Sequence, residues 1–345
     1  MSVYNGENFI HEAMESILNQ TFTNYEFLII DDASTDRSAE ILNSYKDSRI
    51  RYIRNTQNIG LTRSLNNGLK LAQGIYIARM DCDDISLPER LQRQVEFMDR
   101  HPEVGVCGTW VRTIGDRDGE VYTFPTEHKT IASKLFFENV IAHPSVIIRK
   151  KYLDEHDLSY DTELYCSQDY EFWIRCSKYF YLSNIPEVLL LYRLHGQQIR
   201  NQHAIDQLIS ADSTYLHQLE NYLGITPSEE ELSLHRAIIY QKNDVKNLHL
   251  KKINSWFAKL IQSNKKTQYY PEPQFTNMLR EKGFSIFYSR IKQGLWDWSI
   301  LNPPTSVDVI QLGLFERLHF FLIWLRKTLT NYIAKYNLVH DEDLR

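Results

Sequence analysis

Two short runs of aspartates are the parts of the sequence best suited to chemistry. One is Asp31-Asp32, the other is the run Asp81 to Asp84 with carboxylates at 81, 83 and 84, and each follows a short apolar stretch. Carboxylates at alternate positions of a tight turn can point the same way, and such oxygen ligands suit Mg²⁺ or Mn²⁺, which could bridge a diphosphate. Taken alone, a D-x-D motif is more often a helix cap or a solvated turn.

The elements that must position these aspartates alternate between strand and helix. Short apolar runs at 25–30, 50–53 and 75–80 are typical of buried strands, and apolar residues at helical spacing predict helices at 8–18, 39–45 and 61–72. Such alternation favours a mostly parallel sheet covered by helices. In an open sheet of this kind ligands bind at the carboxyl ends of the strands, which is where both aspartate runs stand.

Further elements follow the second run. Ser86-Leu87-Pro88-Glu89 has the form of a capping box with proline in the first turn, so we expect a helix from about Leu87, and Ser34 can cap an earlier helix in the same way. Strands are expected at 104–107, 145–148 and 188–192, and a helix at 170–177. Beyond Asn201 strand signals fade and the segments 204–222, 232–240 and 248–261 are typical of helices. We therefore expect two domains, an α/β domain over 1–201 and a mainly helical extension over 202–345.

Composition excludes several classes of protein. The chain has 345 residues, a formal net charge of −5, 24% charged and 43% hydrophobic residues. These values are typical of a globular protein and exclude whole-chain disorder and a basic nucleic-acid binder. The four cysteines are too scattered for a disulfide framework or a CxxC zinc site, which favours the reducing cytoplasm. We expect no signal peptide and no transmembrane helix.

A succession of motifs identifies a family. Residues 3–7 (VYNGE), 29–36 (IIDDASTD), 58–61 (NIGL) and 78–84 (ARMDCDD) occur in this order, each at an expected strand end or helix start. The succession resembles glycosyltransferase family 2, the inverting nucleotide-sugar transferases with a GT-A fold. Residues 142–145 and 192–198 are also similar to the bacterial surface-polysaccharide branch of that family. The resemblance covers roughly the first 200 residues, so residues 1–201 would form the GT-A nucleotide-sugar-binding catalytic domain.

The resemblance implies a role for each matching residue on the donor side. Val3, Tyr4 and Glu7 would line the nucleoside pocket. Asp32 would meet the base or the ribose, and Arg79 would lie near the diphosphate. The donor would be a nucleotide sugar, in the first place a UDP-sugar, carrying a hexose or an N-acetylhexosamine.

The resemblance also implies the reacting groups. Asp81 would contact the ribose or sugar, and Asp83 would hold Mn²⁺ or Mg²⁺ on the diphosphate. Asp169 matches the family's catalytic base, which takes the proton of the attacking acceptor hydroxyl. The acceptor would be a saccharide or a lipid-linked saccharide. Gln168 departs from the usual Glu-Asp pair, which leaves the base in place and puts the neighbouring contact to acceptor or metal in doubt.

Other polar residues keep two interpretations. His143 and His195 are either satisfied loop histidines or part of the site, and neither is predicted to be catalytic. Asp31 and Asp36 are either helix-start acids or ligand contacts. Family members carry several more residues before the equivalent of Met1, so we expect that the native chain starts upstream or that part of the central strand is missing.

Two other functions share some of these features. A sugar-1-phosphate nucleotidyltransferase would need a Gly-rich N-terminal phosphate loop with basic residues, and residues 1–8 supply only Gly6. A non-catalytic sugar- or nucleotide-binding relative would explain Gln168, but Asp83 and Asp169 together argue against it.

An apolar stripe lies near the C-terminus. It is flanked by basic residues and is too interrupted to span a bilayer. Either it attaches the protein peripherally to the inner face of the cell membrane, or it packs against the rest of the protein or a second subunit. The stripe consists of Leu314, Leu318, Phe321, Leu325, Leu329 and Tyr332.

Overall fold

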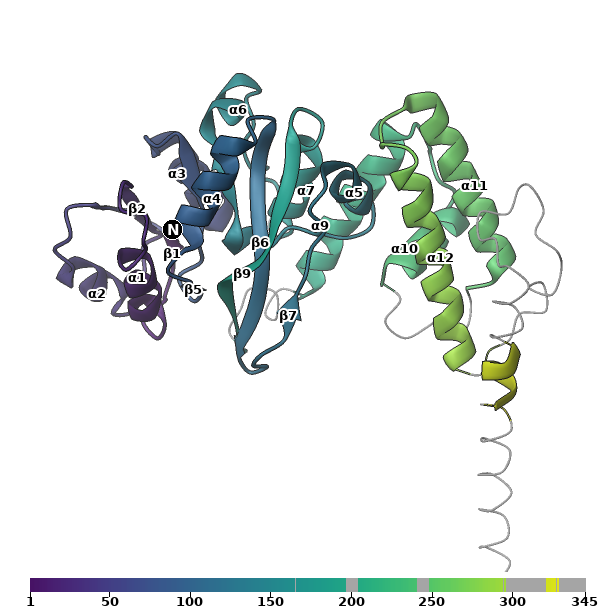
Figure 1. Ribbon diagram of the computed structural model, residues 1–345, viewed down its shortest axis with the longest axis horizontal. Helices are drawn as coiled ribbons and strands as arrows, with labels where there is room; N and C mark the ends of the chain where they lie inside the picture. Colours follow the sequence, from purple (N-terminus) through teal and green to yellow (C-terminus); the bar gives the residue numbers. More distant parts are fainter. Residues whose placement is uncertain are drawn as a thin grey trace, which may run out of the picture. The chain divides into compact units, whose positions relative to one another are not determined.

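Two units make up the chain, Met1–Tyr215 and Leu216–Arg345. The computed structural model describes residues 1–164, 166–196, 204–240, 248–293, 295, 321–326 and 328 (Figure 1). The expected domain boundary after Asn201 falls outside these described residues.

The first unit begins with a small parallel sheet in the order β1-β2-β3. The buried residues of its first helix, Ile10, Ala13, Met14 and Ile17, recur at helical spacing and pack with Ile29 in one apolar cluster. Because the three strands run parallel, they all end on the same edge of the sheet. The buried cluster holds the end of β2, with its aspartates, at that edge. The elements are β1 (Ser2–Val3), α1 (Ile10–Leu18), β2 (Phe27–Asp31), α2 (Ser38–Ser44), β3 (Ile50–Arg54) and α3 (Leu61–Leu71).

A second sheet has the order β4-β8-β6-β9-β5, with β7 paired to β6. Among the described strands of this sheet, β6 and β9 alone pair in parallel, and they run side by side over most of their length, as Figure 1 shows. The pairs β4–β8, β6–β8, β5–β9 and β6–β7 are antiparallel. A single parallel bridge between Ser2 and Asp81 joins β1 to the chain just beyond β4. The strands are β4 (Tyr76–Ala78), β5 (Ile85–Ser86), β6 (Val104–Gly115), β7 (Val121–Tyr122), β8 (Ile147–Arg149) and β9 (Tyr181–Leu194).

The remaining helices lie between these strands along the chain, except α9, which follows β9 and ends two residues beyond the first unit. A cluster of Met98, Val104, Cys107 and Ile147 fixes α4 on β6 and β8. The helices are α4 (Arg90–Arg100), α5 (His128–Lys134), the 3₁₀ turn η1 (His143–Ser145), α6 (Lys150–Glu155), α7 (Gln168–Cys176) and α9 (Ala204–His217). The α/β fold class is confirmed, and the antiparallel pairs are a detail that alternation of elements does not reveal.

Two predicted helix caps were wrong. Ser86 caps no helix, because it belongs to β5, where it pairs with Leu190 of β9. Its hydroxyl accepts a hydrogen bond from Arg90 Nη1 at 3.0 Å. Helix α4 begins only at Arg90, after the proline. Ser34 likewise makes no cap of α2. The strands expected at 104–107 and 188–192 are confirmed, and they are parts of the longer strands β6 and β9. A register shift between Thr109 and Trp110 leaves Pro186 without a partner in the β6–β9 ladder.

The second unit is helical in its described part. Trp256, Phe257 and Leu260 of α11 are buried, and the Trp256 indole N–H donates to His235 Nδ1 of α10 at 3.2 Å. None of the helices in the described ranges combines the length and hydropathy needed to cross a bilayer. The predicted C-terminal stripe lies mostly outside those ranges; residues 321–326 are helical. The elements are the π turn η2 (Gln218–Tyr222), α10 (Glu229–Tyr240), α11 (Leu250–Thr267) and α12 (Gln274–Lys292).

Candidate active site

Three carboxylates gather in the turn between β4 and β5. Asp81, Asp83 and Asp84 can each bring one ligand oxygen within 4.8 Å of the others. Asp84 is fully buried, and its Oδ2 has no hydrogen-bond partner among the described residues. Burial and the neighbouring Asp83 raise the pKa of Asp84 well above its usual range. An unpartnered buried carboxylate oxygen beside two further carboxylates fits a divalent cation.

Arg79 connects this cluster to the rest of the site. Its side chain is buried, and its guanidinium forks onto Asp81, with Nη1 2.6 Å from Oδ2. The same charge interacts with Tyr160, Asp84 and Asp169. Burial raises the pKa of Asp81 in spite of the adjoining guanidinium. Arg79 therefore brings the acidic turn and Asp169 into one electrostatic environment, although the two lie far apart in the sequence.

The end of β9 supports the acidic turn from the other side. His195 Nε2 lies 2.9 Å from Asp83 Oδ2. Arg193 donates its backbone N–H to Asp84 Oδ1 at 2.8 Å and its side-chain Nε to the Asp83 carbonyl at 2.7 Å. Arg193 was missed by the sequence analysis, and His195 was left open. The 192–198 motif was the available signal, since it contains both residues.

A buried arginine lies behind the turn. Arg90 is fully buried, and its Nη2 donates to the Arg79 carbonyl at 2.6 Å and to the Val146 carbonyl at 3.3 Å. Burial lowers the pKa of Arg90 to about 9. This guanidinium joins α4 to the end of β4, and sequence reasoning did not single it out.

Asp169 is the second residue of α7. Its Oδ2 accepts a hydrogen bond from Asn139 Nδ2 at 2.8 Å. Burial raises the pKa of Asp169, while the N–H of Tyr170, Arg79 and Asn139 act in the opposite direction. Asn139 was not singled out in the sequence.

His143 lies in the buried turn before β8. Its Nε2 is 2.8 Å from the Tyr160 hydroxyl, and its ring meets Trp173 edge-on with the ring centroids 5.8 Å apart. Burial, reinforced by Arg79, lowers the pKa of His143 well below its usual value. These surroundings therefore favour the neutral imidazole, which is paired with the Tyr160 hydroxyl.

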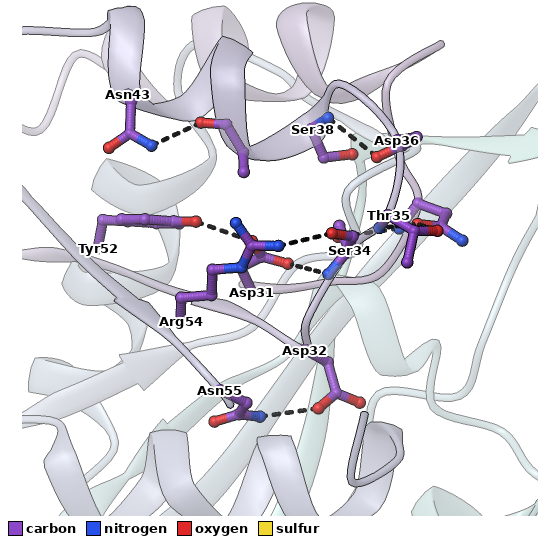
Figure 2. A network of polar contacts seen from close by, with 12 residues as sticks. Asp31, Asp32, Ser34, Thr35, Asp36, Ser38, Asn43, Tyr52, Arg54 and Asn55 are labelled. Atoms are coloured by element: carbon purple, nitrogen blue, oxygen red, sulfur yellow. Dashed lines mark hydrogen bonds and ion pairs between the residues drawn. The ribbon is translucent and has the colours of Figure 1, made fainter. Parts of the chain in front are cut away.

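The end of β2 is a second acidic position, and Figure 2 shows how its carboxylates are engaged. Asp32 Oδ1 accepts from Asn55 Nδ2 at 2.8 Å and from the Ile59 N–H at 2.9 Å, and Oδ2 accepts from the Gly60 N–H at 2.9 Å. Asp31 accepts from the Ser34 N–H at 2.8 Å and from the Tyr52 hydroxyl at 2.7 Å, with Arg54 beside it. These carboxylates shape the loops that follow β2 and β3.

The turn after β1 is fastened to the loop after β2. Asn5 donates its N–H to Ser34 Oγ at 3.1 Å, and the Gly6 N–H donates to Ser38 Oγ at 2.8 Å. Glu7 exchanges two bonds with this loop, its N–H donating to Asp36 Oδ2 and its Oε2 accepting from the Arg37 N–H, both at 3.0 Å. Asp36 therefore stabilises the loop after β2 by accepting the N–H of Glu7.

The residues predicted for the nucleoside pocket therefore share one corner of the first unit. Val3 is buried, and its carbonyl accepts the Asp32 N–H at 2.8 Å. Tyr4 is 50% exposed, so its ring is accessible to a ligand.

Comparison with known proteins gives a consistent result. The family model described as glycosyl transferase family 2 matches residues 1–157. An uncharacterised glycosyltransferase of Haemophilus influenzae is 33% identical over 64% of this chain and 72% of its own length. The O-antigen biosynthesis glycosyltransferase WbnJ of Escherichia coli is 32% identical over 57% of this chain and 79% of its own length.

Solved structures share the fold. S. aureus TarS 1–349 in complex with UDP is 18% identical, with a TM-score of 0.55 over 86% of this chain and 90% of that chain. The mannosyltransferase PcManGT from Pyrobaculum calidifontis, in complex with GDP-Man and Mn2+, is 14% identical, with a TM-score of 0.50 over 82% of this chain and 78% of that one.

Proposed function

Because the chain belongs to glycosyl transferase family 2 and is a glycosyltransferase, we propose that it transfers a sugar from a nucleotide-sugar donor to an acceptor hydroxyl with inversion at the anomeric carbon. The observation that carries the proposal is the cluster of Asp81, Asp83 and Asp84 at the carboxyl end of β4. The non-catalytic and nucleotidyltransferase alternatives are set aside, because the relatives are glycosyltransferases.

The donor end of the proposed site is formed by residues from the first sheet. The nucleoside is surrounded by Val3, Tyr4 and Glu7, and Asp32 contacts the base or ribose. This assignment is supported by the hydrogen bonds between the turn after β1 and the loop after β2. A UDP-sugar with a hexose or N-acetylhexosamine is the expected donor, since S. aureus TarS has been solved with UDP and UDP-GlcNAc on the same fold. Arg79 lies beside the diphosphate.

Asp83 would hold Mg²⁺ or Mn²⁺ on the diphosphate. The unpartnered Asp84 oxygen and the surplus of carboxylates support this assignment. The cation, when bound, neutralises charge that grows on the nucleotide as its bond to the sugar breaks. Asp81, which the Arg79 guanidinium holds in place, would contact the ribose or the sugar.

Asp169 is assigned as the general base. The acceptor oxygen attacks the anomeric carbon as its proton passes to the Asp169 carboxylate, and the bond between that carbon and the nucleotide oxygen breaks. The electrostatic interaction of Asp169 with Arg79 and Asp81 supports its place at the site. Because only the ionised carboxylate accepts the proton, activity falls as pH drops through the pKa of Asp169. Burial moves this acid limb above the carboxyl group's ordinary value of 3.8.

The acceptor is proposed to be a saccharide or lipid-linked saccharide of the cell envelope, handled in the cytoplasm. WbnJ is named for O-antigen biosynthesis, which supports an envelope polysaccharide. Peripheral membrane attachment through the C-terminal stripe remains a proposal. Truncation after Thr305 should abolish co-sedimentation with anionic liposomes and leave the catalytic unit folded.

Asp169→Asn tests the proposed function. A thermal-shift screen of UDP-, GDP- and dTDP-sugars with Mn²⁺ identifies the donor, and release of the nucleotide then reports turnover. We expect the variant to lose about 10²–10⁴-fold in kcat, because proton transfer no longer has an acceptor. Affinity for the nucleotide should stay unchanged in calorimetry, and the acid limb of the pH profile should disappear. Full activity in this variant would remove Asp169 from the mechanism.

A further inference from the structure

We propose that Asn139 is a positioning residue, which holds the Asp169 carboxylate in the plane needed to receive the acceptor's proton. The inference rests on the proposed function, because it presupposes Asp169 as the base. The contact joins two segments 30 positions apart, and Asn139 Nδ2 donates to Asp169 Oδ2 at 2.8 Å.

Asn139 is itself oriented. Its amide oxygen accepts the N–H of Ile141 at 3.2 Å, which turns the NH₂ end toward Asp169. The side chain is exposed, but Val140 and Ile141, the next two residues, are buried in the core. A short anchored segment therefore presents one amide donor to the carboxylate. An aspartate at this position would present only oxygens, which repel it.

Asp169 is also held from its own helix. The backbone N–H groups of Asp169 and Tyr170 interact with its carboxylate at the start of α7. These groups fix the position of the side chain, but a carboxylate can still rotate about its last bond. A donor on Oδ2 removes that freedom, so the lone pairs that remain point in one direction. Proximity gained in this way raises the rate only when the acceptor is bound.

The charges around Asp169 stay the same when Asn139 is replaced. The groups that interact with Asp169 are Arg79, which favours the ionised carboxylate, and Asp81 and Tyr160. Loss of the Asn139 donor removes a hydrogen bond made to the ionised form. The acid limb of the pH profile should therefore move to higher pH, which loss of fold alone would not produce.

Asn139→Ala tests the proposal in the full chain, with turnover of the donor found by thermal shift and UDP as the binding probe. We expect kcat to fall about tenfold, a part of the 10²–10⁴-fold supplied by the base, with unchanged affinity for UDP and Mn²⁺. Asn139→Asp should lose more, because it sets a second carboxylate against the first. The matched control is Asn43→Ala, an exposed asparagine whose Nδ2 donates to the Ala39 carbonyl at 2.7 Å in α2, drawn in Figure 2; it should leave kcat unchanged.

A double variant separates this inference from the proposed function. In an Asp169→Asn background, Asn139→Ala should cost nothing further, since the residue to be positioned has gone. An equal further loss there, or unchanged kcat and pH profile in Asn139→Ala, overturns the inference. Full activity of Asp169→Asn overturns the proposed base instead. If Asn139→Ala does not fold, Asn139→Ser, which keeps a polar side chain too short to reach Asp169, takes its place with the same expected outcomes.

Discussion

Two strand ends of the first unit carry clustered carboxylates, a pair after β2 and three after β4, and the two clusters differ in their hydrogen-bond partners. At the end of β2, Asp31 and Asp32 together accept hydrogen bonds from backbone N–H groups, an asparagine and a tyrosine. At the end of β4, Asp84 is just as buried, yet its Oδ2 has no partner among the residues described, and Asp81 and Asp83 lie within reach of it.

The difference teaches how one sequence signal serves two purposes. The donors to the β2 pair come from nearby in the chain. Ser34 lies in the loop after β2, and Asn55 and Gly60 lie in the loop after β3. The β4 group obtains its donors from distant segments, through Arg193 and His195, and one oxygen of Asp84 has no partner among the described residues. The first pair therefore acts mainly as a frame, and the second is the place where a cation is expected.

Asp83→Ala should give the largest contrast. We expect it to weaken UDP binding in the presence of Mn²⁺ by about 100-fold, since disturbing even the outer contacts of a metal site costs 10–100-fold. Asp31→Asn should leave that affinity nearly unchanged once folded. Titration calorimetry with and without Mn²⁺ measures both. Equal losses in the two variants would erase the distinction between the strand ends.

Metal removal should affect only the β4 end. Mn²⁺ at 100 times its Kd should raise the free energy of unfolding by about 2.7 kcal/mol, and EDTA should reverse this. The increase should persist in Asp31→Asn and vanish in Asp83→Ala. Thermal melts across a Mn²⁺ series provide the measurement, and a metal-independent wild type would count against the cation.

Asparagine substitutions without metal should have opposite signs at the two ends. Asp84→Asn removes a buried carboxyl group whose ionised form is repelled by Asp83 and Asp81, and it should stabilise the protein in EDTA. Asp31→Asn instead replaces one of two acceptor oxygens by a donor, so that either the Ser34 N–H or the Tyr52 hydroxyl loses its acceptor. We expect a loss of about 2 kcal/mol for Asp31→Asn, a gain of about 1 kcal/mol for Asp84→Asn, and a decrease in turnover for the latter. Urea unfolding of Asp31→Asn and Asp84→Asn in EDTA measures the two changes in free energy of unfolding. If both variants are less stable than the wild type, Asp84 has a structural role like that of Asp31.

Tyr52→Phe should have the smallest effect. It removes one hydroxyl from the Asp31 carboxylate, at 2.7 Å, in a half-buried position. We expect a loss of about 1 kcal/mol in the free energy of unfolding and no change in Mn²⁺-dependent binding. A marked loss of nucleotide affinity would instead extend the donor pocket into this network.

The sequence predicted what depends on local pattern. The positions of β2 and β4 follow from short apolar runs, and the aspartate clusters from their place after those runs. Asn139 and Arg193 could not be found in this way, because their partners lie 30 and 109 positions away in the chain. Ser86 was misassigned for a related reason. A serine two residues before a proline predicts a helix cap. Here the backbone of Ser86 pairs with β9 and its hydroxyl accepts from Arg90, so the helix begins later.

Asn66 joins α3 to the segment that contains Tyr160, through a contact that resembles one rung of a sheet. Its side chain donates to the Tyr160 carbonyl at 2.8 Å and accepts the Tyr160 N–H at 2.9 Å, across 94 positions. The loop that carries Tyr160 to the buried His143 is thus bonded to α3, and the residue that precedes α3, Gly60, donates its N–H to Asp32. The amide proton of Tyr160 can exchange with solvent only when its hydrogen bond to the Asn66 side chain breaks. The hydrogen-exchange rate of Tyr160 should therefore follow the opening of α3 rather than that of the loop containing Tyr160.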